Sequence, residues 1–283
     1  MRRLRGLRGS LRSRGHLDEK PPMTEGGYSA ASDWFAAYVN GFRDAGGALP
    51  PALQLKLEHS LRVAEDAGRI AAELGRDPAY VRLARAAGLL HDIGRFAQFS
   101  SSGNFSDSSS DHGEAGAGVM ASRSGEFISD PAEAALITCS VRWHNRRTGD
   151  IPGDLAGPEA ALLLLVRDAD KLDIMRIALE SMERDGFSDL PSMLPGVSLS
   201  GDITPGTLEA AGDCSLPASS LRTLSDFIIM VLGWFRDFNY APSLRLALRR
   251  GIPEKLRSRL PAGPAVDGFF KDILEAARAG AGI

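Results

Sequence analysis

The sequence contains few of the residues that cross-link small secreted domains or that bind metal ions through sulfur. Its 283 residues include two cysteines, Cys139 and Cys214, which lie far apart and match no paired metal-ligand spacing. Their scarcity excludes a disulfide framework and suits a reducing compartment. We therefore expect a cytoplasmic protein.

Long apolar runs and a large excess of one charge are also missing. The longest apolar run, residues 227–235, is much shorter than the roughly 20 residues that a membrane-spanning helix needs, so it is interpreted as a buried helix. The formal net charge is −3, which gives no overall field favouring nucleic acid or a membrane surface. We expect neither as a partner, and the sequence leaves the oligomeric state open.

Strand signals are scarce, whereas helical signals recur along the chain. No segment alternates apolar and polar residues with a sustained period of two, and β-branched residues are sparse. Apolar residues at helical spacing and helix-start signals such as Asp77-Pro78 predict an all-α fold. Predicted helices cover residues 32–42, 54–75, 77–93, 111–124, 130–144, 158–173, 218–238, 242–250 and 265–279. The apolar face of 54–75 is formed by Leu55, Leu61, Val63, Ile70 and Leu74.

Composition divides the chain into four parts. Residues 1–27 form an arginine-rich tail in which Asp18 is the first acidic residue. This tail is interpreted as a disordered extension or as a start codon placed too early, with Met23 as the actual start; an organelle transit peptide is the alternative. Residues 28–185 are predicted to form the helical core, and 186–217, rich in Gly, Pro and Ser, a loop or lid. Residues 218–283 are predicted to be C-terminal helices that pack on the core.

The stretch 88–95, Gly-Leu-Leu-His-Asp-Ile-Gly-Arg, carries the first candidate ligands. It is interpreted as the end of an apolar helix that presents His91 and Asp92 and stops at Gly94, followed by a loop over 96–111. An imidazole beside a carboxylate offers two ligands to a divalent metal ion. Taken alone, the pair is equally consistent with a helix end that carries a capping histidine.

The positions of the histidines along the chain are compatible with one shared site. The chain has five histidines, and all except His16 lie within predicted helical segments, as does Asp170. If these helices pack as one bundle, their polar positions can converge on a single cavity. The candidate set is His59, His91, Asp92, His112, His144 and Asp170. Such a set can hold two divalent ions that share one carboxylate.

The order of these residues resembles the HD-domain superfamily of metal-dependent phosphohydrolases. The motif carriers are His59, then His91-Asp92, then Asp170, and the resemblance covers roughly residues 54–180. It implies an HD-domain-like helical bundle, with additional C-terminal helices here, in which these four residues hold a first metal ion. By the same resemblance Asp92 bridges to a second ion held by His112 and His144, as in six-ligand binuclear members.

The resemblance leaves the last ligand and the metal to be assigned. Asp168 competes with Asp170 for the last ligand position, and Asp170 is favoured because family members typically place the ligand immediately before a basic residue, here Lys171. The two ions could be Mn, Fe, Mg, Ni, Co or Zn, because imidazole and carboxylate suit all of them.

The chemistry predicted from such a site is phosphoester hydrolysis with a metal-activated water. Bound divalent ions lower the pKa of water towards neutrality and neutralise charge on a phosphoryl group. Asp92 and His112 are the candidate catalytic residues. The candidate contacts to substrate phosphate are the basic residues beside the proposed ligands: Lys171, Arg95, Arg146 and Arg147. The predicted substrate is a nucleotide or another small phosphorylated metabolite.

One branch of the superfamily is disfavoured, and two other functions stay open. The segment 144–153 lacks the second histidine and the tyrosine that the cyclic-dinucleotide phosphodiesterases carry. A di-iron oxygenase, as in inositol oxygenase, is an alternative because a similar ligand set holds iron. A non-catalytic nucleotide-binding or signal-binding HD domain is the other.

Overall fold

The structure is a computed structural model that describes residues 23–283 except 108–109, 189, 191–193 and 195. Helices form its regular structure: these residues contain no β-strand, and an isolated bridge pairs Ser198 with Thr223. The prediction of an all-α fold is therefore confirmed. The predicted tail falls mainly on residues 1–22, which lie outside the described residues.

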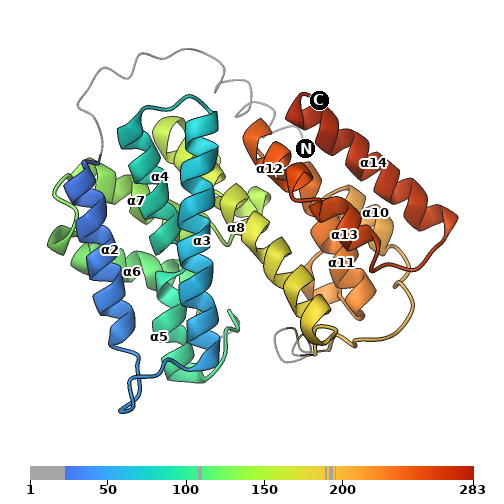
Figure 1. The fold of residues 1–283 in the computed structure, drawn as a ribbon, viewed down its shortest axis with the longest axis horizontal. Helices are drawn as coiled ribbons and strands as arrows, with labels where there is room; N and C mark the ends of the chain where they lie inside the picture. The colour runs from blue at the N-terminus through green and yellow to red at the C-terminus, as the bar shows by residue number, and fades with distance from the viewer. Residues whose placement is uncertain (1–22, 108–109, 189, 191–193, 195) are drawn as a thin grey trace. The chain divides into compact units, whose positions relative to one another are not determined.

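Contacts divide the chain into two units between Asp170 and Lys171, inside the long helix α8 (Gly157–Asp185). The helices of the first unit are α2 (Glu25–Asn40), α3 (Pro51–Glu73), α4 (Pro78–Leu90), α5 (Ile93–Ser102), α6 (His112–Arg123) and α7 (Pro131–Trp143). Helix α3 packs along α4, and α6 packs against both α5 and α7 (Figure 1).

The second unit contains five further α-helices among the described residues. They are α10 (Thr207–Gly212), α11 (Leu224–Gly233), α12 (Ala241–Arg249), α13 (Ile252–Arg257) and α14 (Pro264–Ala281). Helix α10 lies within the segment 186–217, whose role as a loop or lid stays a prediction. The apolar run at 227–235 falls mainly in α11, where every residue from Asp226 to Gly233 is buried. Among the helices that the structure describes, none combines the length and the apolar character of a membrane span.

The buried face of α3 differs from the predicted one at Leu61. The buried residues His59, Val63 and Ile70 follow each other at helical spacing, whereas the Leu61 side chain is 50% exposed. Position 61 lies two residues after His59 and therefore about 200° around the helix axis from it. Once the His59 side chain points inward, Leu61 must point towards solvent.

The chain breaks earlier than predicted at the His-Asp pair. Helix α4 ends at Leu90, and a second helix, α5, begins at Ile93 and continues to Ser102, so the predicted stop at Gly94 is wrong. The predicted loop over 96–111 is correspondingly shorter and begins at Gly103, which has a left-handed backbone (φ +70°). Gly94 instead allows close packing, because a Cβ atom there would lie 2.1 Å from the carbonyl oxygen of His112.

Replacing Gly94 with alanine is expected to destabilise the first unit. The added methyl group has no space against the backbone of α6, and such overpacking costs about 1–3 kcal/mol or more. Gly118→Ala is the matched control, because a Cβ atom on Gly118 in α6 meets nothing within 4 Å and alanine is the better helix former. Denaturant unfolding followed by circular dichroism should show a lower midpoint for Gly94→Ala only. Equal midpoints would contradict the packing argument.

In the second unit, the carboxylate of Asp226 ties the chain before α11 to that helix. It accepts hydrogen bonds from the backbone N–H groups of Thr204, Arg222 and Thr223 and from the hydroxyls of Thr204 and Thr207, and the side chain is fully buried. Burial raises the pKa of Asp226, but these hydrogen bonds outweigh it and lower the pKa below its ordinary value. The ionised form therefore stabilises the fold.

Asp226→Asn should destabilise the chain near neutral pH by about 1–3 kcal/mol, because an amide cannot accept all of these hydrogen bonds. A lowered folded-state pKa gives stability that is complete above the ordinary aspartate pKa, about 3.9, and is lost as the pH falls below it. The difference between wild type and Asp226→Asn should therefore shrink between about pH 5 and 3, measured by unfolding midpoints. Asp202→Asn, at an exposed carboxylate of the same segment, serves as the control. A difference that does not depend on pH would contradict the assignment.

Candidate metal centre

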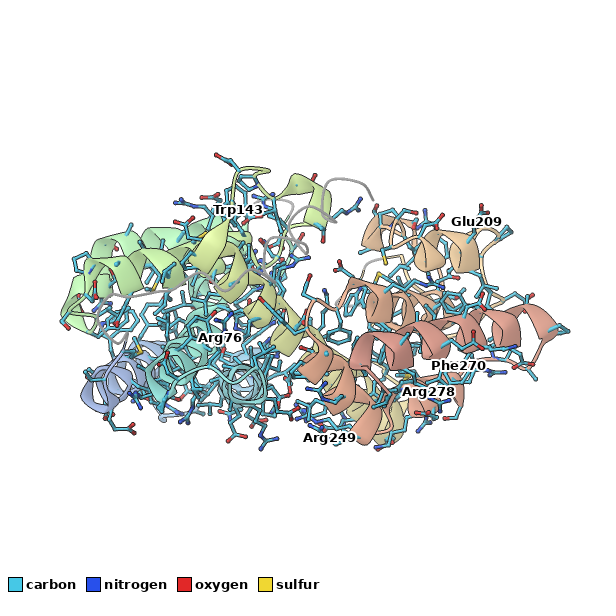
Figure 2. All side chains as sticks on the ribbon, turned by 90° about the horizontal axis from the view of Figure 1, so that it is seen from above. Arg76, Trp143, Glu209, Arg249, Phe270 and Arg278 are labelled. Atoms are coloured by element: carbon cyan, nitrogen blue, oxygen red, sulfur yellow. The ribbon has the colours of Figure 1, made fainter. Side chains whose placement is uncertain are left out.

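The candidate ligands come from five helical elements of the first unit and meet in its interior. His59 lies in the middle of α3, and His91 and Asp92 form the break between α4 and α5. His112 is the first residue of α6, and His144 follows Trp143 (labelled in Figure 2) at the end of α7. Asp170 lies in α8. The side chains of His59, His91, Asp92, His112 and His144 are at most 4% exposed, and that of Asp170 is 16% exposed.

The first group of ligand atoms joins α3, α8 and the break after α4. The Nε2 atoms of His59 and His91 lie 3.2 Å apart. Oδ1 of Asp170 lies 3.1 Å from Nε2 of His59 and 3.7 Å from Nε2 of His91. These three residues could hold a metal ion. Asp168 and Asp170 were both candidates for the last ligand position. Asp170 makes these contacts, and Asp168 is buried elsewhere on the same helix.

The second group lies on the other side of Asp92. The Nε2 atoms of His112 and His144 lie 3.1 Å apart, and each is 3.4 Å from Oδ1 of Asp92. Oδ2 of Asp92 lies 3.6 Å from Nε2 of His59 and 3.7 Å from Nε2 of His91. The two oxygens of one carboxylate thus face two different histidine pairs, which is the arrangement of a bridging ligand.

Backbone carbonyls at helix ends orient two of the imidazoles. His91 and His144 occupy the C-cap positions of α4 and α7. Nδ1 of His91 donates to the carbonyl oxygen of Gly88 at 2.7 Å, and Nδ1 of His144 donates to that of Val141 at 2.8 Å. Because a carbonyl oxygen can only accept, the proton is on Nδ1, and Nε2 keeps its lone pair for a metal ion. The final turns of these helices thereby satisfy carbonyl groups that would otherwise lack a partner.

Asp107 orients the third imidazole and was not among the predicted site residues. Its carboxylate oxygens accept from Nδ1 of His112 at 2.8 and 3.0 Å. A carboxylate behind a ligating histidine fixes the ring and makes the other nitrogen a better ligand. Asp107 lies in the loop before α6, and its only signal in the sequence is an acidic residue among serines.

The charges around the site match what metal ligands require. Burial raises the pKa of Asp92, but the Lys56 ammonium and the neighbouring imidazoles outweigh it and hold the pKa well below its usual range. Burial also raises the pKa of Asp170, and hydrogen bonds from His59 and His91 lower it well below that range. Burial lowers the pKa of His144 to about 4. At neutral pH the carboxylates are therefore ionised and His144 is neutral.

The basic residues predicted to bind phosphate mostly have partners within the protein. Arg95 donates to Gln98, to the carbonyl oxygen of Phe105 and to Asp107. Arg146 forms an ion pair with Asp111 at 3.1 Å, and Lys171 forms one with Asp237 at 2.6 Å within the second unit. The side chain of Arg147 is exposed. Their contact with substrate stays a prediction. Lys56, which the sequence reasoning missed, places Nζ 2.7 Å from Oδ2 of Asp92.

Removing the charge of Asp107 should weaken metal binding. Asp107→Asn keeps an acceptor for His112 but loses the carboxylate, and changes to such outer partners typically cost 10–100-fold in metal affinity. Isothermal titration with Mn²⁺ measures the effect. Asn104→Ala is the control, because Asn104 holds the same loop through hydrogen bonds with Ser102 and Ser106 rather than with Asp107 or His112. An equal loss in both variants would assign the effect to the loop instead.

Comparison with known proteins agrees with this geometry. Residues 57–175 match the family model of the HD domain, and this range contains all of the candidate ligands. No solved structure matched the chain. The resemblance inferred from the order of His59, His91-Asp92 and Asp170 is thereby confirmed, and the chain contains an HD domain at residues 57–175.

Proposed function

We propose that the chain is a metal-dependent phosphohydrolase that cleaves a phosphoester bond of a small phosphorylated molecule, such as a nucleotide, with water. The observation that carries this proposal is the position of Asp92, whose two oxygens face two buried histidine pairs. The match to the HD domain, whose superfamily members are typically metal-dependent phosphohydrolases, supports the same reaction type.

The residues present fit divalent metal ions. His112 and His144 hold their Nδ1 protons towards Asp107 and the carbonyl oxygen of Val141, so their Nε2 lone pairs face each other across 3.1 Å. Two lone pairs at this distance repel each other unless a cation lies between them. His59, His91, Asp92 and Asp170 would hold a first ion, and Asp92, His112 and His144 a second. Ions bound there would supply Lewis acidity to a phosphoryl oxygen and hydroxide near neutral pH.

The chain itself supplies orientation and charge. Asp92, ionised and buried, stays fixed between the two histidine pairs, and the carbonyl groups of Gly88 and Val141 prevent the His91 and His144 rings from rotating. As the alternative to its role as a ligand, His112 is the proposed acid–base residue, because a ring that binds a metal ion through Nε2 cannot also transfer a proton there. Low exposure of the histidines excludes bulk water from the reacting groups and strengthens their electrostatic interactions.

Metal analysis and activity assays test the proposal together. Protein purified without chelator should contain a divalent metal and should release phosphate or alcohol from members of a phosphomonoester and phosphodiester panel with added Mn²⁺. Asp92→Asn and His91→Ala should lose the bound metal, and their activity should fall about 100-fold or more. Changes to residues that only hydrogen-bond to metal ligands typically cost about 10–100-fold, and loss of a ligand itself should cost at least as much. Asp154→Asn is the matched control at an exposed carboxylate outside the site.

Three outcomes would contradict the proposal. Full metal content and activity in both ligand variants would place the site elsewhere. Iron in the purified protein, with substrate-dependent oxygen uptake and no hydrolysis, would instead favour the di-iron oxygenase, because the ligand types alone suit iron as well. Absence of bound metal in the wild type, with nucleotide binding retained, would favour the non-catalytic function.

A further inference from the structure

Lys56 lies beside the candidate metal centre and contacts one of its proposed ligands directly. It is in α3, one turn before His59, and its side chain is 20% exposed. Nζ donates to Oδ2 of Asp92 at 2.7 Å and also lies 5.6 Å from the centre of the Phe105 ring. The Lys56 side chain is therefore partly exposed, and its ammonium group touches the carboxylate that faces both histidine pairs.

Lys56 differs from the neighbouring cations in the acceptor of its hydrogen bond. Arg95 donates to Asp107, and Arg146 pairs with Asp111, carboxylates that are not proposed metal ligands. Arg95 also pairs with Asp92, but at the longer distance of 3.7 Å between Nε and Oδ1. Binding of metal ions would leave the pairs with Asp107 and Asp111 unchanged. The acceptor of Lys56 is Asp92, whose negative charge would be shared with the ions.

Charge decides what happens to the ammonium when metal ions bind. Ions on Asp92 reduce the attraction between its oxygen and Nζ of Lys56, and they repel the ammonium group at short range. The proposed ligands bring two negative charges, from Asp92 and Asp170, against four positive charges from two divalent ions. Lys56 adds a further positive charge at the solvent side, so the loaded site attracts an anion that carries more than one negative charge.

We propose that Lys56 binds a phosphoryl oxygen of the substrate and that the substrate presents a terminal, dianionic phosphate. This inference rests on the proposed function and deepens it by naming a binding residue and a substrate class. In the absence of metal the same ammonium neutralises Asp92 and keeps the carboxylate in place. A lysine suits the second role as well, because its ammonium is a compact charge on a flexible stem and can turn from one oxygen to another.

The test measures metal binding and phosphate binding separately, without relying on turnover. Isothermal titration gives the affinity of wild type and Lys56→Met for Mn²⁺, and then for orthophosphate at saturating Mn²⁺. Lys56→Met should bind Mn²⁺ as tightly as wild type or several-fold more tightly, because a repelling charge is removed. It should bind orthophosphate roughly 10-fold or more weakly, the effect of losing a hydrogen bond to a charged group.

Two further variants make the result specific. Lys56→Arg keeps the charge and should bind orthophosphate within a few-fold of wild type. Lys271→Met, at a 74% exposed lysine of the second unit, should change neither affinity. Circular dichroism confirms that each variant is folded. On phosphate monoesters and diesters, the loss in kcat/KM for Lys56→Met should be larger for monoesters.

Several results would overturn the proposal even if the hydrolase function holds. Unchanged orthophosphate binding in Lys56→Met, or no orthophosphate binding by the Mn²⁺-loaded wild type, would exclude a phosphate contact. A 10-fold weaker affinity for Mn²⁺ would show that Lys56 only positions Asp92. Failure of the hydrolase proposal is distinguishable, since it would appear as an absence of turnover in wild type with phosphate binding still dependent on Lys56.

Discussion

A buried carboxylate placed between two histidine pairs is the contact on which the site of the first unit depends. Desolvating a lone carboxylate costs several kcal/mol, so Asp92 can remain ionised in the interior only because positive or polarisable groups surround it. Lys56 and the imidazoles provide that environment in the structure. The same surroundings make the carboxylate available to metal ions from both sides. Removing Lys56 or an imidazole leaves the buried carboxylate with fewer stabilising partners, which couples the stability of this region to its chemistry.

Helix ends supply most of the candidate ligands, and two of these histidines are oriented in the same way. His91 and His144 both stand at C-cap positions, and each ring donates to the carbonyl three residues earlier. The helix terminus gains a hydrogen-bond donor for a free carbonyl, and the ring gains a fixed orientation. The close approach of α5 to α6 at Gly94 then sets the spacing between Asp92 and His112. Packing and ligand geometry are thus determined by the same contacts.

Most of the helices and the order of the ligands could be predicted from the sequence, because both depend on local signals. Helical periodicity locates α3, and Asp-Pro pairs locate the starts of α4 and α7. The break at His91 could not be located in this way, because the sequence has no proline or glycine at that point and Gly94 indicated a stop further along the chain. Asp107 and Lys56 were missed for a related reason: their roles depend on which atoms they reach after folding, and an isolated acid or lysine carries no such information.

Lys171 shows the limit of reasoning from neighbours in the chain. It directly follows Asp170, which suggested that its ammonium would reach the same site. Consecutive residues of a helix point about 100° apart. Accordingly the Asp170 carboxylate contacts His59 in the first unit, while the Lys171 ammonium donates to the carboxylate and the carbonyl oxygen of Asp237 in the second. Lys56, by contrast, precedes His59 by three residues and lies on the same side of its helix. Here a separation of three residues along one helix, rather than adjacency, brings a charge into contact with the candidate site.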